Sequence, residues 1–221
     1  MCSDLYNDEY FINRSGTDLL RQSSMAQEVS WIKTNTNQTL KTICDIGCAA
    51  GEFKVHWPDT NYYGMEINSH AIEKAKKNGV LFDKNILNSE GFFDIVLFRG
   101  TIQHVNSPFD YLSASYKALK PGGYLALLAT PNTGSLVYRI SQHLPMLDPS
   151  LNLYMPSIKS VKDLIRIYSF KTVAVEVPYW NSPYRDFIKD HLDFLKVLFG
   201  GVPKKAFWGN SFNLIAQKCT Q

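Results

Sequence analysis

The sequence lacks the features that would attach this protein to a membrane or to a nucleic acid. No window approaches the ~18 consecutive apolar residues of a membrane-spanning helix, and the start, Met1 to Asp4, has no basic residues followed by an apolar stretch. The net charge is only +3, and lysine and arginine are not massed into a run. We therefore expect a cytoplasmic protein with no signal peptide, no membrane span and no nucleic-acid partner.

Cysteine is also scarce, and its spacing does not form a convincing metal site. Of the four cysteines, Cys44 and Cys48 lie closest together and flank a tight turn. Their spacing is compatible with zinc, but a buried strand is a poor place to recruit the remaining ligands of a tetrahedral site. We expect reduced thiols and no metal.

What the chain does contain is enough apolar material for one ordinary domain. Its 221 residues are 45% hydrophobic and 13% aromatic. Apolar segments alternate with amphipathic ones, which is typical of an α/β protein. Beyond a first strand near residue 43, we expect strands at 61–65, 80–82, 93–98, 124–129, 172–177 and 212–216, and helices at 69–77, 108–119 and 160–168.

Residues 43 to 53 hold the most informative pattern. An apolar run ends at Asp45 and breaks into small residues at positions 47, 49 and 51, which is how a buried strand turns sharply into a helix. A phosphate-binding P-loop is excluded, because no Gly-Lys-Ser/Thr follows. A dinucleotide fingerprint would place its acid after the glycines, whereas Asp45 precedes them. A strand-turn-helix without a ligand is the alternative at this point.

The order acid-x-Gly-x-Gly-x-Gly resembles motif I of the class I S-adenosylmethionine-dependent methyltransferases, with Asp45, Gly47 and Gly51 in place. Ala49 departs from the family, which usually has glycine there. S-adenosylmethionine carries no phosphate, but it has an amino-acid end, a sulfonium cation and a ribose. The resemblance implies that Asp45 holds the ammonium group and that the small residues admit the methionyl moiety against bare backbone.

Three further motifs follow in the family's order. Glu66 lies 15 residues after Gly51, at the end of the next expected strand, where an acid can accept hydrogen bonds from ribose hydroxyls. Residues 93–96 (Phe-Asp-Ile-Val) and 102–105 resemble the family's fourth-strand motif, and residues 119–125 resemble its Leu-x-Pro-Gly-Gly turn before the fifth strand. The resemblance implies a Rossmann-like, doubly wound α/β sheet of seven strands, with the last strand antiparallel and helices on both faces.

We expect one methyltransferase domain over residues 1–221, in three parts. Residues 1–40 would form a helical lid over the cofactor or merely cover the edge of the sheet. Residues 41–132 would be the cofactor-binding core, and residues 133–221 the acceptor side with the last strands.

The resemblance also implies a set of S-adenosylmethionine contacts. Either Asp83 or Asn85 would meet the adenine amino group, with Ile86 beside the ring. Phe53 would line the methionine side or pack in the core. The full expected set is Asp45, Gly47, Cys48, Ala49, Gly51, Phe53, Glu66, Ile67, Asp83, Asn85, Ile86, Arg99 and Gly100.

Two histidines are the expected catalytic residues. Methyl transfer is a displacement at carbon, and a hydroxyl acceptor needs a base, for which histidine is suited near neutral pH. His104 lies in the expected loop after the fourth strand, and His143 lies in the next irregular segment. The alternative for His104 is that it only organises its loop.

The acceptor is expected to bind to residues 133–210, because specificity lies in segments added to the core. Tyr138, Arg139, His143, Tyr154 and Met155 are the expected wall of its pocket. Residues 206–211, with Thr-Pro-Asn at 130–132, resemble methyltransferases of bacterial surface-polysaccharide clusters, which implies a sugar or nucleotide-sugar acceptor. The alternatives are a phenol, a carboxylate, an amine or a non-catalytic partner subunit.

A row of apolar residues near the end of the chain suggests a packing surface. Leu192, Leu195, Leu198 and Phe199 share the spacing of one helix face. We expect this face to pack on the core or on a second subunit, which allows a homodimer.

Overall fold

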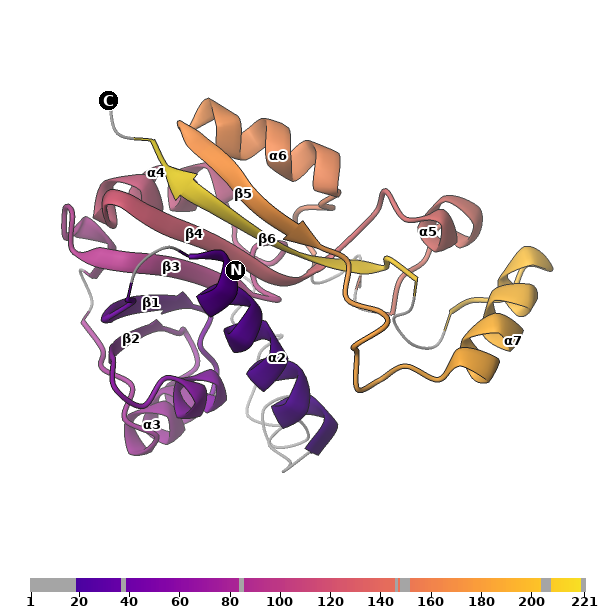
Figure 1. The fold of residues 1–221 in the computed structure, drawn as a ribbon, viewed down its shortest axis with the longest axis horizontal. Coiled ribbons are helices and arrows are strands. Elements are labelled where there is room, and N and C mark those ends of the chain that lie inside the picture. Colours follow the sequence, from indigo (N-terminus) through magenta and orange to yellow (C-terminus); the bar gives the residue numbers. More distant parts are fainter. Residues whose placement is uncertain are drawn as a thin grey trace.

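The chain folds around one mixed β-sheet with helices on both of its faces (Figure 1). The computed structural model describes residues 19–36, 39–83, 86–145, 147, 152–203 and 208–219. The strands are β1 (Thr42–Ile46), β2 (Asn61–Met65), β3 (Phe93–Arg99), β4 (Leu119–Pro131), β5 (Phe170–Glu176) and β6 (Ser211–Lys218). The helices are α2 (Leu19–Asn35), α3 (Ser69–Lys77), α4 (Pro108–Ala118), α5 (Leu136–Ser141), α6 (Ile158–Ile167) and α7 (Phe187–Leu198), with 3-10 turns η2 (Glu52–His56) and η3 (Ile86–Asn88).

The strand order is β2-β1-β3-β4-β6-β5, and β6 runs antiparallel to both of its neighbours. The Rossmann-like α/β fold with an antiparallel last strand is thus confirmed, but the count of seven strands is wrong for the described residues, which form six. In the expected third strand only Leu81 pairs, through one parallel bridge to Tyr63 beside β2. Its backbone exchanges hydrogen bonds of 2.8 Å with Tyr62 and Gly64, and η3 begins before a longer ladder can form.

Alternating residues of the central strands feed two hydrophobic cores, one on each face of the sheet. On one face, Phe98 of β3 belongs to the same cluster as Leu112 of α4 and Ile165 of α6. On the other face, Leu97 of β3 shares a cluster with residues of α2, η2 and α3. A strand that is buried on both faces has a nearly continuous apolar sequence, and this is the pattern at residues 93–98.

Helix α2 packs one of its faces against the sheet. Met25, Val29 and Ile32 are buried against the sheet. Their spacing of four and three residues places them on one helix face. This face of α2 therefore covers the sheet, as the alternative to the lid supposed. Residues 1–18 of the expected lid lie outside the described residues.

Asp94 connects the first residues of β1, β3 and β4, at the end of the sheet opposite to motif I. Its carboxylate accepts hydrogen bonds of 2.8 Å from the backbone N–H groups of Lys41 and Thr42 and pairs with Lys120 Nζ at 2.7 Å. The turn expected at residues 120–123 is a bulge inside β4, because Leu119 already pairs with Phe93 before the register shifts. The acid in the 93–96 motif is thus structural.

Helices α5 and α7 stand beyond the edge of the sheet at which β5 ends and β6 begins (Figure 1). The apolar row at Leu192, Leu195, Leu198 and Phe199 is exposed. Of the two expected alternatives, packing on the core is therefore wrong for this row, since Val197 and Phe194 make that contact instead. None of the described helices combines the length and the apolar content needed to cross a bilayer.

Candidate functional site

The turn after β1 places three residues in the left-handed region of backbone space. Gly47, Ala49 and Gly51 have φ angles of 77°, 47° and 74°. A β-carbon on Gly47 would lie 2.5 Å from the Thr101 side chain, and one on Gly51 would lie 2.6 Å from Val80 Cγ2. Contacts inside the protein therefore also require glycine at positions 47 and 51, where the motif predicts a ligand.

Ala49 is the strained member of this turn, because a β-carbon disfavours the left-handed region. We expect Ala49→Gly to stabilise the fold by about 0.5–1 kcal/mol, since relief of that strain exceeds the added flexibility of glycine in the unfolded chain. Ala50→Gly is the matched control, because Ala50 is not among the residues with positive φ. Urea unfolding should give opposite signs for the two variants; destabilisation by Ala49→Gly would contradict the strain.

Asp45 lies at the end of β1 and is 2% exposed. Its Oδ2 accepts a 2.6 Å hydrogen bond from the Tyr62 hydroxyl, whereas its Oδ1 is buried without a partner among the described residues. A buried carboxylate oxygen without a donor is costly. An ammonium group would satisfy it, so the residue present here fits the amino-acid end of S-adenosylmethionine.

Burial raises the pKa of the Asp45 carboxyl from 3.8 to about 7; the nearby Glu66 raises it too, while the Tyr62 hydrogen bond and Arg99 oppose the rise. Between those two pH values the native state therefore binds more protons than the unfolded chain. It follows that this group makes the fold less stable as the pH rises from about 4 to 7.

The titration of Asp45 should have the opposite effect on the affinity for a cationic ligand, which is expected to rise as the pH rises. An ammonium group binds the carboxylate and not the carboxylic acid, so the affinity for S-adenosylmethionine is expected to fall by up to about tenfold per pH unit below pH 7. Calorimetric titrations between pH 5.5 and 8 would measure this. Asp45→Asn should remove the dependence, and an equally steep dependence in that variant would assign it to another group.

Glu66 lies at the end of β2, directly beside the turn. Its Oε2 accepts a 3.0 Å hydrogen bond from the Ala49 N–H, and its Oε1 accepts bonds of 2.7 and 3.0 Å from the N–H groups of Ile67 and Asn68. Glu66 thus joins the two strand ends. A carboxylate offers about four acceptor positions, which leaves room for a ribose hydroxyl beside these bonds.

Arg99 ends β3 and is neutralised inside the protein. Its Nε lies 2.6 Å from Glu28 Oε2 and its Nη2 lies 3.3 Å from Glu28 Oε1. Both side chains are mostly buried. The guanidinium also stacks on Phe53, with 5.7 Å from its carbon to the ring centroid. Arg99 is thus held by α2 and η2 at the edge where Gly100 begins the next loop.

The other expected cofactor residues divide between the core and the surface. The side chains of Cys48, Phe53 and Ile86 are in the hydrophobic core, so the structure favours the packing alternative for Phe53. Cys48 Sγ would lie 2.5 Å from a β-carbon on Gly64, which explains the glycine in β2. Ile67 is 70% exposed beside Glu66. Asp83 is described, whereas Asn85 lies outside the described residues.

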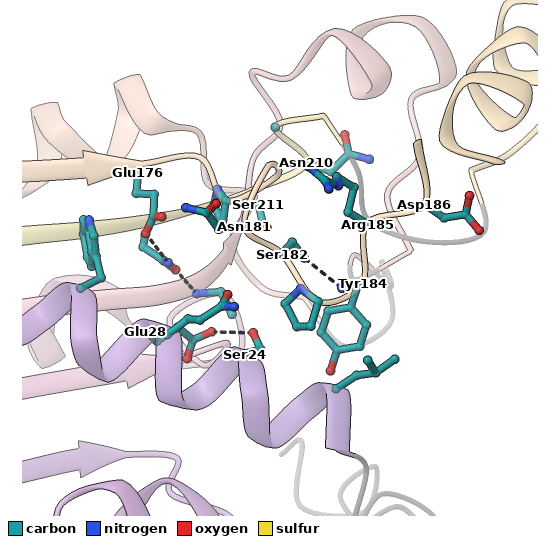
Figure 2. Close-up of a pocket in the computed structure, with 18 of the residues that line it drawn as sticks. Ser24, Glu28, Glu176, Asn181, Ser182, Tyr184, Arg185, Asp186, Asn210 and Ser211 are labelled. Atoms are coloured by element: carbon teal, nitrogen blue, oxygen red, sulfur yellow. Dashed lines mark hydrogen bonds between the residues drawn. The ribbon is translucent and has the colours of Figure 1, made fainter. Parts of the chain in front are cut away.

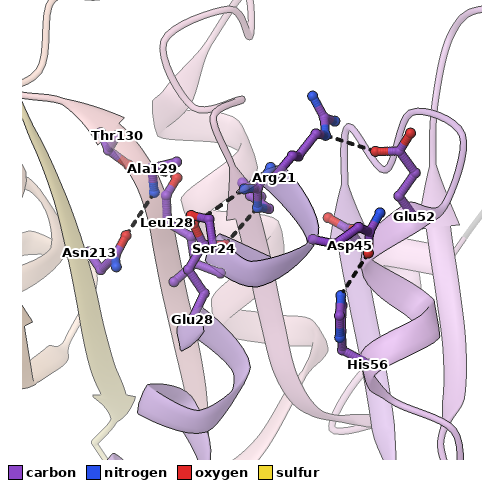
Figure 3. A network of polar contacts seen from close by, with 12 residues as sticks. Arg21, Ser24, Glu28, Asp45, Glu52, His56, Leu128, Ala129, Thr130 and Asn213 are labelled. Carbon is purple, nitrogen blue, oxygen red and sulfur yellow. Dashed lines mark hydrogen bonds and ion pairs between the residues drawn. The ribbon is translucent and has the colours of Figure 1, made fainter. Parts of the chain in front are cut away.

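Polar contacts fasten the first half of α2 to the region after motif I (Figure 3). Arg21 Nε lies 2.8 Å from Glu52 Oε2, and Gln22 Oε1 lies 3.1 Å from His56 Nε2. Together with the Glu28–Arg99 pair, these contacts place α2 across the ends of β1 and β3. One face of the helix therefore borders the site with polar side chains, while its apolar face belongs to the core.

A cavity of about 1120 Å³ opens beside this helix, at the ends of β3, β4 and β5 (Figure 2). Ser24 and Glu28 of α2 line one side, and the segment from Pro178 to Asp186 lines the other. In open α/β sheets, ligands bind outside the carboxyl ends of the parallel strands. Of the expected cofactor residues that the structure describes, only Arg99 lines this cavity, so it is a neighbour of motif I.

The cavity differs from the expected acceptor pocket. None of Tyr138, Arg139, His143, Tyr154 and Met155 is among its lining residues. The cavity has other walls because β5 and β6 return to the same end of the sheet and bring later residues to it. The functional candidates missed by sequence reasoning are Glu176, Arg185, Asn210 and Asn213. The sequence did point to Asn210, since it lies within residues 206–211, which resemble the surface-polysaccharide methyltransferases.

The two segments that resemble the surface-polysaccharide methyltransferases, residues 130–132 and 206–211, contact each other in the structure. The Asn132 N–H donates to the Asn210 carbonyl at 2.8 Å, and Asn132 Nδ2 donates to the Gly209 carbonyl at 2.9 Å. Residues 130–132 and 209–211 are therefore neighbours at one edge of the cavity. Ala206 and Phe207 of the same segment lie outside the described residues.

Neither expected catalytic histidine lines the cavity. His104 is half-buried in the loop after β3, and its Nε2 lies 3.1 Å from Gln103 Nε2. The Gln103 carbonyl in turn accepts from the N–H groups of Leu153 and Tyr154 at 2.9 and 3.2 Å. This favours the loop-organising alternative for His104. His143 is exposed, and its backbone is held by Ser141.

A family model described as a methyltransferase domain matches residues 20–175, from α2 to nearly the end of β5. The chain belongs to this methyltransferase family. Motif I and Glu66 lie within the matched residues, so the resemblance drawn from them is confirmed at the level of the family. Membership implies S-adenosylmethionine as the methyl donor, in agreement with the sequence.

Relatives of this methyltransferase are named for oxygen methylation. The ubiquinone biosynthesis O-methyltransferase of Roseobacter denitrificans is 31% identical over 110 residues, which are 43% of each chain. That of Paraburkholderia xenovorans is 26% identical over 110 residues, 44% of this chain and 47% of the relative. The chain spans about half the length of the curated relatives it matches.

Solved methyltransferase structures share the fold of the whole chain. A SAM-dependent methyltransferase from Archaeoglobus fulgidus superposes with a TM-score of 0.64 at 19% identity, covering 96% of this chain and 100% of the other. One from Thermotoga maritima superposes with a TM-score of 0.63 at 21% identity, covering 91% and 90%. At these identities the similarity concerns the fold alone.

Proposed function

We propose that this chain catalyses the S-adenosylmethionine-dependent methylation of a hydroxyl oxygen on a small molecule that binds in the cavity. The observation that carries the proposal is the cavity's position at the ends of β3, β4 and β5, where it shares Arg99 with the region after motif I. Bound S-adenosylmethionine supplies an electrophilic methyl group on a good leaving group. The protein must therefore align the acceptor, exclude water and accept the hydroxyl proton.

The residues around motif I would hold the methyl donor. Asp45 Oδ1 would accept from the ammonium group, and Glu66 would accept from the ribose. The polar face of α2 would act as the lid, because Arg21 and Glu28 already bridge to Glu52 and Arg99 beside these acids. Cofactor affinity should therefore depend on both acids, as expected from the sequence.

A carboxylate in the cavity is our candidate for the base. Glu176 ends β5 and lines the cavity, and among the residues that the structure describes its Oε2 has only a long 3.4 Å hydrogen bond from Asn213 Nδ2. Asn213 is held in turn by the Ala129 N–H at 2.8 Å. Glu176 would take the proton as the acceptor oxygen bonds to the methyl carbon. His104 and His143 stay as the alternatives predicted from the sequence.

A sugar or nucleotide-sugar of surface-polysaccharide biosynthesis is the acceptor that we propose. The lining supports this acceptor, because amide and hydroxyl side chains alternate with the rings of Trp31 and Tyr184. Rings stack on the apolar faces of sugars while the polar groups bind hydroxyls. The alternative is a non-sugar small molecule, namely a phenol, a carboxylate or an amine; the curated relatives, which are named for O-methylation in ubiquinone biosynthesis, favour an oxygen acceptor of this kind. A non-catalytic, cofactor-binding partner subunit is a further alternative.

The test separates binding from transfer. Calorimetry with S-adenosylmethionine examines the donor site, and release of S-adenosylhomocysteine with nucleotide sugars, glycans and phenols examines the reaction. Glu176→Gln is expected to lower turnover about 100-fold with unchanged donor affinity, whereas Glu73→Gln, an exposed control on α3, should do nothing. Loss of turnover in His104→Gln alone would transfer the role to histidine. Donor binding without release on any acceptor would favour the partner-subunit alternative.

Two expectations about the whole protein belong to the same proposal. We place it in the cytoplasm, where S-adenosylmethionine and nucleotide sugars are available. We also propose a homodimer in which the exposed apolar row of α7 is covered by a second copy, since a row of this kind is unfavourable in water. Sedimentation of the wild type and of Leu195→Lys would test the dimer.

A further inference from the structure

The cationic residues lining the cavity are unequally neutralised. Arg99 is paired with Glu28 at 2.6 Å. Lys189 and Lys196 pair with Asp186 and Asp193 at 3.0 and 3.1 Å, each within one turn of α7. Arg185 differs from them, because it has no ion pair with any acid among the described residues. One lining guanidinium therefore keeps its charge available to a ligand.

Arg185 is positioned by its own segment. Its N–H donates to the Ser182 carbonyl at 3.1 Å, and its guanidinium lies over the Trp180 ring at 5.7 Å from the centroid. Stacking of this kind leaves the edge of the guanidinium, with its N–H donors, free to bind a ligand. Figure 2 shows the side chain extending toward Asn210 at the wall of the cavity.

Asn210 is a buried amide with an unused donor. It is 1% exposed and lines the same cavity. Its Oδ1 accepts a 3.0 Å hydrogen bond from Ser135 Oγ, and its carbonyl accepts from the Asn132 N–H at 2.8 Å. Its Nδ2 has no acceptor among the described residues. Since Oδ1 is engaged by Ser135, the amide presents a donor and not an acceptor.

We infer that Arg185 and Asn210 form an anion subsite, which binds a negatively charged group of the methyl acceptor. This inference rests on the proposed function and extends it. Both groups only donate at this point, and an anion only accepts, so phosphate or carboxylate oxygens complement the two donors and also the guanidinium charge, which a neutral hydroxyl does not. The nearby Asp186 does not cancel the site, because its carboxylate is engaged by Lys189.

The subsite would orient the acceptor. Glu176 lies at a strand end and Arg185 in the loop that follows, so a ligand held at both would present a hydroxyl to one and an anionic group to the other. A nucleotide-sugar would use its pyrophosphate, and a carboxylated phenol or sugar acid would use its carboxylate. The acceptor class is then anionic in either case.

The test measures anion binding directly, without turnover. Inorganic pyrophosphate and malonate are titrated into the full chain saturated with S-adenosylhomocysteine, at constant ionic strength. We expect Arg185→Ala to weaken the preferred anion about tenfold or more, with Arg185→Lys intermediate and Arg185→Glu without measurable binding. Arg166→Ala is the matched control, since Arg166 is an exposed arginine on α6 away from the cavity. Asn210→Asp, checked for folding by circular dichroism, should also abolish binding.

The outcomes separate this inference from the proposed function. Preference for pyrophosphate would identify a phosphate subsite, and preference for malonate a carboxylate subsite. No binding of either anion by the wild type, or equal affinity in wild type and Arg185→Glu, would overturn the subsite even if S-adenosylhomocysteine binds. Failure of S-adenosylhomocysteine to bind would instead count against the proposed function. With an active acceptor, Arg185→Ala should raise KM and leave kcat unchanged.

Discussion

Gly51→Ala is expected to destabilise this protein by about 3 kcal/mol, because two costs add at one position. The residue has a φ of 74°, which an alanine adopts only with strain. Its new β-carbon would also lie 2.6 Å from Val80 Cγ2 and 3.1 Å from the backbone Cα of Ala75. Neither neighbour can withdraw easily, since both are buried in the core on the α2 side of the sheet.

Gly91→Ala is the control that isolates the packing cost. Gly91 also has a positive φ, 60°, but a β-carbon there would meet nothing within 4 Å. We expect it to cost about 1–2 kcal/mol from backbone strain alone. Chemical denaturation of both variants would measure the difference. In Gly51→Ala/Val80→Ala the two effects should not add, because the smaller side chain makes room. Equal destabilisation by the two glycine variants would refute the packing argument.

Glu28→Gln is expected to cost about 3 kcal/mol, because it leaves the Arg99 guanidinium buried without a counter-charge. The two side chains are only 8% and 18% exposed, and their closest atoms are 2.6 Å apart. The pair is also the main polar contact between α2 and β3. Its loss should therefore loosen the helix that borders the donor site, and thermal unfolding would report the change.

A surface ion pair provides the control for this effect. Asp163 pairs with Lys159 at 2.8 Å, with side chains 49% and 89% exposed. Asp163→Asn should have little effect on stability, since water screens such pairs. Replacing both members of the buried pair, as Glu28→Leu with Arg99→Met, should restore most of the stability. If Glu28→Gln were as mild as Asp163→Asn, the pair would be solvated in solution.

Local patterns in the sequence were good guides wherever one segment determines its own structure. The strand at residues 61–65 and the helix at residues 69–77 have the predicted bounds. Gly47 and Gly51 have the left-handed backbone that a sharp turn after a buried strand requires, and Glu66 hydrogen-bonds to this turn through the Ala49 N–H. Periodicity and turn chemistry act over a few residues, so they are readable without the fold.

The sequence was less informative about features that depend on a residue far away in the chain, such as strand pairing and ion pairing. Val80 to Phe82 resemble a strand, but only Leu81 finds a partner in β2 before the chain turns into η3. Arg99 was predicted to contact the cofactor, whereas its nearest charge is Glu28, 71 residues earlier in the chain. A single side chain gives no sign of which distant residue will neutralise it.

The sequence by itself determined the family and the cofactor, and it predicts the end of the sheet at which that cofactor binds. These follow from a short, ordered set of residues whose backbone requirements are local. Only the tertiary structure revealed the cavity that we propose for the acceptor, because β5 and β6 return to the same end of the sheet and carry Glu176, Arg185 and Asn210 to a cavity beside α2. Those residues are distant in the chain from motif I, and only the pairing of β6 between β4 and β5 brings them to it.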